Sequence, residues 1–305
     1  MPVAPALPTG VLAMAARGPA WSDWVERLPA LLRDLIAEWE LRVDGEPLHG
    51  FTAVVVPVVT KGGLMAVLKV GFPDEESALE HLALTRWEGA GAVRLMRADP
   101  HRRALLLEHL RGQDLGEAWD VEACGVVAEL YGRLHVPAPA QFRRLSAALV
   151  EPLTQLRALE RSAPLPRRMV EQAVSLAGDF VKDVDTDGTL IHTDLHYGNV
   201  LMGGRETWLA IDPKPLSGDP HYELAPMLWN RSEELEGDLR NGVRRRFHAL
   251  VDGSGLDEDR ARDWVVVRMM TNAIWRLTER GPIDTELGDD DWLTLCIAVA
   301  KAVQD

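Results

Sequence analysis

The sequence predicts an α+β protein built from two lobes, a small sheet-rich lobe followed by a larger, mainly helical one. Two observations indicate this class. Runs of β-branched residues that can pair as strands are concentrated in the first third of the 305-residue chain, and the remainder shows helical spacing of apolar residues around one short strand-rich island. Gly112 interrupts the pattern near the boundary. We therefore expect an N-terminal lobe over residues 1–110 and a C-terminal lobe over residues 111–305.

The N-terminal lobe is expected to begin with an amphipathic helix over residues 23–40, where apolar side chains recur at helical spacing. Two β-branched runs, 52–59 and 64–70, are joined by Thr-Lys-Gly-Gly and predict a hairpin. Pro57 lies in the first run and cannot donate a ladder hydrogen bond, so we expect an edge strand or a bulge there. The other elements expected in this lobe are a helix over 74–88 and a strand pair over 92–97 and 103–109.

The C-terminal lobe is expected to be helical on both sides of a strand-rich island at residues 189–212. The expected helices cover residues 117–135, 141–161, 166–183, 221–230, 235–251, 258–279 and 289–303. The island holds the densest polar cluster of the chain, and its apolar triplets flank acidic residues. Short strands would therefore present polar side chains at their ends.

Composition narrows the possible function classes. Lys and Arg number 33 against 47 Asp and Glu, which gives a net charge of −14. This balance disfavours general nucleic-acid binding and suits a cationic small molecule, or a substrate whose charge is handled by bound metal. Cys124 and Cys296 are too far apart in sequence for a CxxC site, and two cysteines build no disulfide framework. No apolar run approaches a membrane span, and the Ala/Pro-rich N-terminus lacks the features of a signal peptide, so we expect a cytoplasmic protein.

Asp194, Asn199 and Asp212 are the residues of the island best suited to chemistry. If a four-residue turn over 203–206 joins its two strands, Asp212 lies opposite Tyr197 and close to Asn199, and the three side chains share one rim. Their hard oxygen atoms suit Mg²⁺, which takes one or two carboxylates and completes its octahedron with water and substrate phosphates. They do not suit a structural zinc site.

The motifs H-T-D-L-H-Y-G-N at residues 192–199 and I-D-P at 211–213 resemble those of the aminoglycoside phosphotransferase family, relatives of the protein kinases. Segments 91–95, 210–214 and 222–225 resemble the streptomycin 6-phosphotransferase and hydroxyurea-resistance kinase branch. The resemblance implies a bilobal protein-kinase-like fold that binds ATP and Mg²⁺ in a cleft. It also implies transfer of the γ-phosphoryl group to a hydroxyl of a streptomycin-like antibiotic.

The resemblance also implies roles for individual residues of the island. Asp194 would accept the proton of the acceptor hydroxyl, and Asn199 and Asp212 would hold Mg²⁺ under the nucleotide phosphates. His192 would brace the loop rather than react.

The family pattern further requires a strand lysine on the nucleotide phosphates, paired with a helix glutamate. Lys69 fits the first role, and Glu80 is the first choice for its partner, with Glu76 one turn away as the alternative. The backbones of Glu108 and Leu110 would hydrogen-bond the adenine edge. No G-x-G-x-x-G motif precedes Lys69, which departs from the protein-kinase pattern.

The acceptor wall of the family would lie just after the metal motif, where Glu223, Trp229 and Glu233 are candidates for binding a cationic antibiotic. The acidic members could equally form a solvated helix face. Two other functions remain open: a kinase of hydroxyurea or a metabolite alcohol, and a kinase-like module that binds nucleotide without catalysis. No obligate protein partner is evident.

Simpler interpretations exist for the same residues. His192, Asp194 and His196 alternate along a strand and could form a transition-metal site. Lys69 could be an ordinary strand-edge lysine. Glu80 alone would more often belong to a solvated helix face, and only Lys69 favours its functional role.

Overall fold

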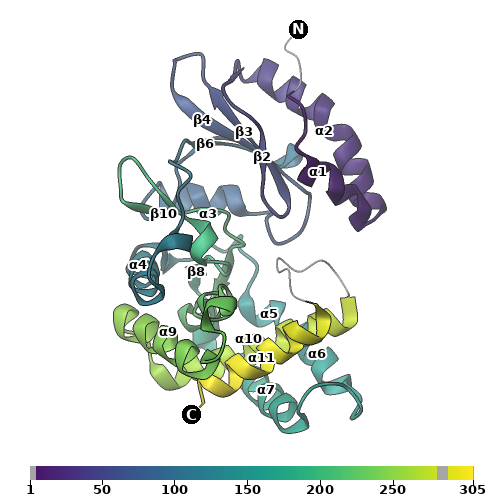
Figure 1. The fold of residues 1–305 in the computed structure, drawn as a ribbon, viewed down its shortest axis with the longest axis vertical. Helices are drawn as coiled ribbons and strands as arrows, with labels where there is room; N and C mark the ends of the chain where they lie inside the picture. Colours follow the sequence, from purple (N-terminus) through teal and green to yellow (C-terminus); the bar gives the residue numbers. More distant parts are fainter. Residues whose placement is uncertain (1–4, 280–287, 305) are drawn as a thin grey trace. The chain divides into compact units, whose positions relative to one another are not determined.

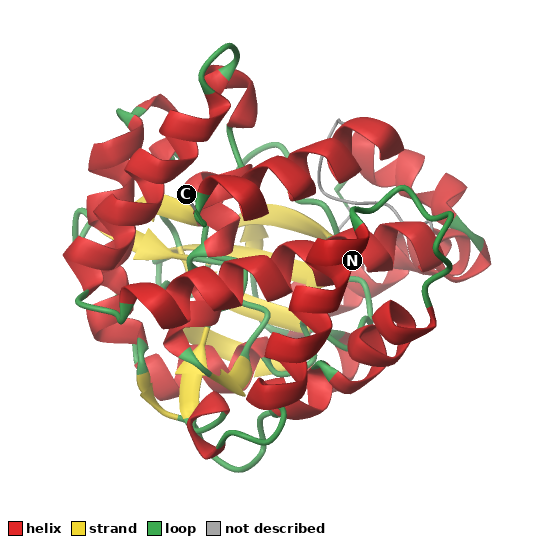
Figure 2. Cartoon of the chain, turned by 90° about the horizontal axis from the view of Figure 1, so that it is seen from below, coloured by secondary structure: helices red, strands yellow, loops and turns green. Residues whose placement is uncertain are grey.

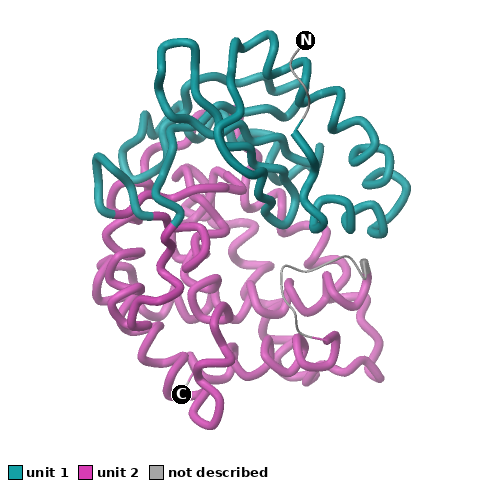
Figure 3. The backbone as a smooth tube through the Cα atoms, turned by 45° about the horizontal axis from the view of Figure 1, so that its top comes forward, with its two compact units in different colours: residues 1–112, 202–207 teal, residues 113–201, 208–305 magenta. Residues whose placement is uncertain are grey.

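The computed structural model describes residues 5–279 and 288–304. The chain divides into two compact units (Figure 3). Unit 1 comprises Met1–Gly112 together with Met202–Thr207, and unit 2 comprises Gln113–Leu201 together with Trp208–Asp305. The segment 202–207 is the tip of a hairpin, and it belongs to unit 1 through contacts such as that of Arg205 with Glu108. Within the described residues, no helix combines the length and apolar character that crossing a lipid bilayer requires.

Unit 1 contains an antiparallel sheet with the strand order β1-β3-β4-β6-β5, and β2 also pairs with β3. The strands are β1 (Arg42–Val43), β2 (Leu48–His49), β3 (Ala53–Val59), β4 (Met65–Gly71), β5 (Leu95–Asp99) and β6 (Ala104–Glu108). The expected hairpin is therefore β3 and β4, in which Val55 lies opposite Lys69.

Pro57 lies in an inner strand, so the expectation of an edge strand or bulge is wrong. β3 pairs with β4 along its whole length on one side. On the other side β2 pairs with Val54 and Val55, and β1 pairs with Val58 and Val59. The proline faces the gap between these two short strands, where its carbonyl accepts a hydrogen bond from the Asp44 N–H at 2.9 Å. A missing N–H is tolerated there because neither neighbouring strand requires a donor at that position.

Helices cover the sheet of unit 1 (Figure 1). The helices of this unit are α1 (Thr9–Ala13), η1 (Met14–Arg17), α2 (Pro19–Glu38), α3 (Glu80–Trp87) and η2 (Pro100–Arg102), and the first three share a core cluster with the sheet. α2 begins earlier than expected because Pro19 occupies its first turn, where a missing N–H does no harm. It buries Leu28, Leu32 and Leu35 against sheet residues such as Leu68 in one core cluster. α3 begins at Glu80 rather than near residue 74, because the segment before it forms turns.

Unit 2 is mainly helical (Figure 2). Its helices are η3 (Leu115–Glu117), α4 (Asp120–Leu134), α5 (Leu145–Ala148), α6 (Val150–Ala158), α7 (Arg167–Phe180), η4 (Val184–Thr186), η5 (Tyr197–Asn199), η6 (Pro220–Glu223), α8 (Ala225–Trp229), η7 (Ser232–Leu235), α9 (Leu239–Ser254), α10 (Glu258–Glu279) and α11 (Asp289–Ala302). The helix expected over 141–161 is split into α5 and α6. Pro152 explains the break, because it cannot donate to the carbonyl of Ala148.

The strand-rich island forms two small sheets. Their strands are β7 (Val136–Pro137), β8 (Thr189–Ile191), β9 (Val200–Met202), β10 (Trp208–Ala210) and β11 (Leu216–Gly218), in the orders β11-β8-β7 and β10-β9. Ile191 of β8 and Leu216 of β11 pack in a core cluster with Phe180 and Trp264, whose rings stack at 3.9 Å. The segment between β8 and β9 is thereby fixed at both ends.

Candidate active site

Asp194 and Asn199 lie side by side in the loop that joins β8 to β9. The Asn199 side-chain amide donates to the main-chain carbonyl of Asp194 at 2.8 Å and to its carboxylate at 3.3 Å. Because Nδ2 is used in these contacts, Oδ1 is the atom of Asn199 that could ligate a metal. Asn199 is buried at 9% exposure, whereas Asp194 is partly exposed. The loop therefore presents one accessible carboxylate beside a held amide.

Asp212 reaches the same loop through the β9–β10 hairpin, although the register differs from the expected one by one residue. The Ile211 N–H donates to the carbonyl of Asn199 at 2.9 Å, and the Gly203 N–H donates to that of Thr207 at 3.1 Å. Asn199 is thus opposite Ile211, and the expected pairing of Asp212 with Tyr197 is wrong. Asp212 follows directly after the paired residue and has φ of 55°.

His192 is completely buried and holds the two segments together. Its Nε2 donates to the Ile211 carbonyl at 2.9 Å, because a carbonyl can only accept, and its Nδ1 accepts from the Asp194 N–H at 3.3 Å. Burial lowers the pKa of His192 below its ordinary value, against opposing effects of Glu223 and Asp194. The neutral ring therefore uses both nitrogens within the protein. This geometry leaves His192 no nitrogen for a transition metal, and the described residues contain no cluster of three or more His, Cys, Asp or Glu side chains suited to one.

Thr193 is fixed from three directions. Its N–H donates to Oε1 of Glu223 at 2.6 Å, its hydroxyl donates to the Lys214 carbonyl at 2.6 Å, and its own carbonyl accepts from Arg268 at 3.0 Å. The backbone has φ of 65°, a region that a β-branched residue rarely adopts. These contacts hold a strained residue directly before Asp194 and thereby fix the backbone from which the Asp194 side chain projects.

Glu223 is placed differently from the acceptor role suggested for it. It is 0% exposed, its Oε2 lies 2.6 Å from Nε2 of His135, and its carbonyl accepts from the Tyr131 hydroxyl at 2.8 Å. Burial opposes ionisation, but the hydrogen bonds from His135 and Thr193 outweigh it and hold the pKa of Glu223 below its ordinary value. Its carboxylate supports the loop, and both of its oxygens have partners within the protein.

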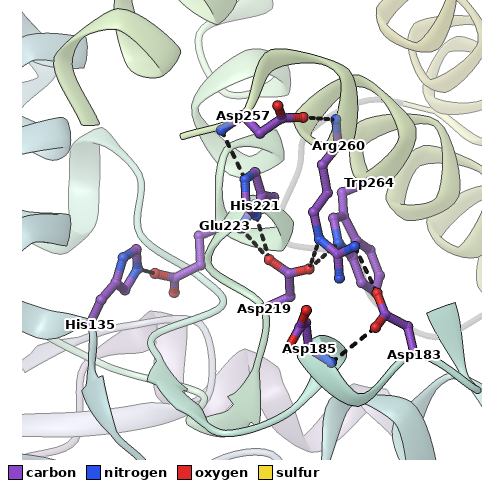
Figure 4. Close-up of polar contacts among 9 residues, drawn as sticks. All are labelled: His135, Asp183, Asp185, Asp219, His221, Glu223, Asp257, Arg260 and Trp264. Carbon is purple, nitrogen blue, oxygen red and sulfur yellow. Dashed lines mark hydrogen bonds and ion pairs between the residues drawn. The ribbon is translucent and has the colours of Figure 1, made fainter. Parts of the chain in front are cut away.

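A second buried carboxylate fixes the segment that carries Glu223 (Figure 4). Asp219 is 1% exposed and accepts from the His221 ring, the Arg260 guanidinium and the Trp264 indole, each at 2.6 Å. The Arg260 guanidinium also contacts Asp183 at 2.8 Å. Burial opposes ionisation of Asp219 too, but the hydrogen bonds from His221 outweigh it and lower its pKa. Glu223 therefore projects from a rigid turn.

Lys69 and Glu80 form a buried ion pair in unit 1. Nζ of Lys69 lies 2.7 and 2.8 Å from the two carboxylate oxygens of Glu80, and the residues are 8% and 5% exposed. Lys69 belongs to β4, an inner strand, so the strand-edge interpretation is wrong, as is the solvated face suggested for Glu80. A contact of Lys69 with nucleotide phosphates remains a prediction.

Glu108, at the end of β6, uses its side chain to fix the segment expected to bind adenine. Its N–H donates to the Arg94 carbonyl at 3.0 Å, while the Arg94 N–H donates to the Glu108 carboxylate at 2.7 Å rather than to the Glu108 carbonyl. The guanidinium of Arg205 lies 2.7 Å from the same carboxylate and also donates to the Ala92 carbonyl at 2.7 Å. Leu110 follows, 8% exposed. An adenine contact from Glu108 would therefore use its carbonyl.

The remaining acceptor candidates lie in unit 2. Trp229 ends α8 and is partly exposed, with its ring 6.1 Å from that of Trp292 and 5.7 Å from the Arg268 guanidinium. Glu233 is exposed in η7. Neither is in contact with Asp194 through any interaction described above, and both remain predictions.

Lys214 is a residue of the site for which the sequence analysis assigned no role. Its Nζ lies 3.0 Å from Oδ2 of Asp212, and its N–H donates to the His192 carbonyl at 3.0 Å. The Asp212 carboxylate therefore has a cationic group of the protein beside it. The hard oxygen atoms of Asp212 and Asn199 fit Mg²⁺, which needs few protein ligands because it keeps water and phosphate.

Comparison with known proteins identifies the relatives of this chain. The family model of the aminoglycoside/hydroxyurea antibiotic resistance kinases matches residues 38–280. Streptomycin 6-kinase of Streptomyces glaucescens is 38% identical over 284 residues, which cover 90% of this chain and 91% of the relative. Hydroxyurea phosphotransferase of Kitasatospora aureofaciens is 41% identical over 270 residues, which cover 86% and 77%.

Solved structures show the fold. A choline/ethanolamine kinase family protein from Mesorhizobium loti matches with a TM-score of 0.61 at 15% identity, over 89% of this chain and 90% of the other. An aminoglycoside phosphotransferase, solved with ADP and hygromycin B, matches with a TM-score of 0.59 at 14% identity, over 88% and 97%. The predicted kinase-like fold is confirmed. Because the family model covers most of the sequence, including all the site residues above, the chain belongs to the aminoglycoside/hydroxyurea antibiotic resistance kinases.

Proposed function

We propose that this kinase transfers the γ-phosphoryl group of ATP to a hydroxyl of an aminoglycoside antibiotic of the streptomycin type. The observation that carries the proposal is the built catalytic loop of unit 2. Asp194 is partly exposed, and Asn199, His192 and Thr193 fix its main chain. Such positioning is what phosphoryl transfer requires of a protein, because the chemistry itself asks for little more than alignment and charge.

In this proposal Asp194 orients the acceptor hydroxyl and takes its proton. The hydroxyl oxygen forms a bond to the γ-phosphorus, the bond to the oxygen that bridges to the β-phosphate breaks, and ADP leaves with that electron pair. Asn199 and Asp212 would hold Mg²⁺, which when bound neutralises charge on the nucleotide phosphates. Lys69, oriented by Glu80, would contact those phosphates.

The acceptor is proposed from relatives and charge. Streptomycin 6-kinase is a relative by name, and the net charge of −14 is compatible with a cationic antibiotic. Hydroxyurea is the second candidate, because hydroxyurea phosphotransferase is 41% identical to this chain.

The test is a mass-spectrometric screen of streptomycin, other aminoglycosides and hydroxyurea with ATP and Mg²⁺. We expect streptomycin to gain the mass of one phosphate group. Asp194→Asn should reduce kcat at least about 1,000-fold while ATP affinity changes little, since removing a proton acceptor affects the transition state and not nucleotide binding. Asp185→Asn, at an exposed carboxylate of the same unit, is the matched control. Retained turnover in Asp194→Asn would refute the assignment of Asp194 as the base. If hydroxyurea alone gained phosphate, hydroxyurea would be the acceptor in place of streptomycin.

A further inference from the structure

Lys214 is held in place by its main chain on both sides. Its N–H donates to the His192 carbonyl at 3.0 Å, and its carbonyl accepts from the Thr193 hydroxyl at 2.6 Å. Pro213 and Pro215 flank it and restrict the backbone further. The residue is therefore tied to the same two residues that precede Asp194. Its backbone is fixed, and its four-carbon side chain reaches Asp212.

The ammonium group of Lys214 is placed at the proposed metal ligand. Nζ lies 3.0 Å from Oδ2 of Asp212, and the two side chains are 15% and 31% exposed. At that exposure the attraction is stronger than between fully solvated charges. The pair offsets the charge of one carboxylate in the segment between β10 and β11, which hydrogen-bonds to the loop that carries Asp194.

This arrangement cannot persist unchanged when metal and nucleotide bind. A divalent cation on Asp212 competes with the ammonium group for the same carboxylate. A metal ion held by Asp212 would neutralise nucleotide phosphates, so anionic phosphate oxygens would come close to the ammonium group of Lys214. A flexible lysine can then exchange one anionic partner for another.

We propose that Lys214 is a catalytic residue that contacts the γ-phosphoryl group during transfer, and that it shields Asp212 before the metal binds. The inference rests on the proposed function. No bond to Lys214 forms or breaks: the proton goes to Asp194, the phosphoryl group goes to the acceptor, and Lys214 balances the charge that develops on the phosphoryl oxygens.

The test compares the full-length wild-type protein with Lys214→Met and Lys214→Arg. Lys182→Met removes an exposed lysine of the same unit and is the matched control. Thermal melting first establishes that each variant is folded. Turnover is measured with streptomycin and, independently of any antibiotic, as slow hydrolysis of ATP by water. The affinity of the protein–ADP complex for Mn²⁺, measured by electron paramagnetic resonance, gives a readout that does not depend on turnover.

In Lys214→Met we expect kcat to fall about 100-fold in both reactions, with the KM for ATP within about threefold of wild type. Mn²⁺ should bind several-fold more tightly, because its competitor at Asp212 has been removed. Lys214→Arg should keep more of kcat, and Lys182→Met should match wild type.

The inference is overturned if kcat in Lys214→Met stays within about twofold of wild type. It is equally overturned if Mn²⁺ affinity falls together with kcat, because Lys214 would then only support the geometry of Asp212. Failure of the wild-type protein to phosphorylate any antibiotic would refute the proposed function instead, since ATP hydrolysis and Mn²⁺ binding still decide the role of Lys214.

Discussion

Two glutamates, Glu108 in unit 1 and Glu223 in unit 2, have the same local task in different surroundings. The carboxylate of each accepts a hydrogen bond from a main-chain N–H of another segment of its unit. Oε1 of Glu108 accepts from Arg94 at 2.7 Å, and Oε1 of Glu223 accepts from Thr193 at 2.6 Å. Both were expected near ligands, and the structure shows both carboxylates supporting the backbone.

The difference between them is the second partner and the exposure to water. The Glu108 side chain is 21% exposed and shares its charge with the Arg205 guanidinium, whose side chain is 23% exposed. The Glu223 side chain is 0% exposed and faces His135. Water can replace part of what a lost exposed pair provides, whereas a buried donor left without its acceptor has no substitute. Loss of this hydrogen bond should therefore lower the free energy of unfolding much more at Glu223 than at Glu108.

The largest effect is expected from Glu223→Ala. It leaves the Thr193 N–H and His135 without their acceptor inside the protein and should lower the free energy of unfolding by about 3 kcal/mol or more. Turnover should fall as well, because Thr193 positions Asp194. Urea unfolding followed by circular dichroism measures the change. Glu129→Ala, at an exposed position of α4, is the matched control and should change stability by less than about 0.5 kcal/mol. Equal stability of the two variants would contradict the comparison.

Glu223→Gln, measured over a series of pH values, should lower the free energy of unfolding less than Glu223→Ala does. It tests the contribution of the carboxylate charge alone. The pKa of Glu223 in the folded protein lies below its ordinary value of 4.5, so the unfolded chain binds the proton more readily. The stability provided by the ionised carboxylate is therefore complete above about pH 4.5 and is lost as pH falls through the lower folded-state value. Urea unfolding of both proteins should show the advantage of wild type over Glu223→Gln shrinking in acid. If the stability advantage of wild type grew in acid instead, the pKa of Glu223 would be raised in the folded protein, which would contradict the prediction.

Features encoded locally could be predicted from the sequence. The β3–β4 hairpin follows from two β-branched runs around a Gly-Gly turn, and Lys69 lies on its second strand. The island at 189–212 is recognisable because apolar triplets and oxygen-bearing side chains alternate there. These patterns depend on residues that are near one another in the chain, and local physics determines them.

Features that depend on distant packing could not be predicted in the same way. The β9–β10 register differs from the expectation by one residue, since turn composition does not determine loop length. The burial of Glu223 depends on α4, which supplies Tyr131, and on His135 directly after it, about ninety residues earlier in the sequence. Arg205 contacts Glu108 across a separation of 97 residues. A glutamate on a solvated helix face and a glutamate that hydrogen-bonds to a distant segment show the same sequence pattern, so the sequence alone does not separate them.

The smallest effect is expected at Glu108, the more exposed of the two glutamates. Arg205→Met and Glu108→Gln each remove the ion pair, and Glu108→Gln keeps an oxygen that can still accept from the Arg94 N–H. A double-mutant cycle should give a coupling of about 0.5–1 kcal/mol in the free energy of unfolding, because a partly exposed pair is weakened by solvent. Because the backbones of Glu108 and Leu110 are predicted to bind the adenine edge, the KM for ATP should rise a few-fold with kcat nearly unchanged. Arg27→Met, at an exposed arginine of α2, is the control. The comparison fails if this coupling energy is as large as the decrease in the free energy of unfolding caused by Glu223→Ala. Exposure to water would then not explain a difference between the two glutamates.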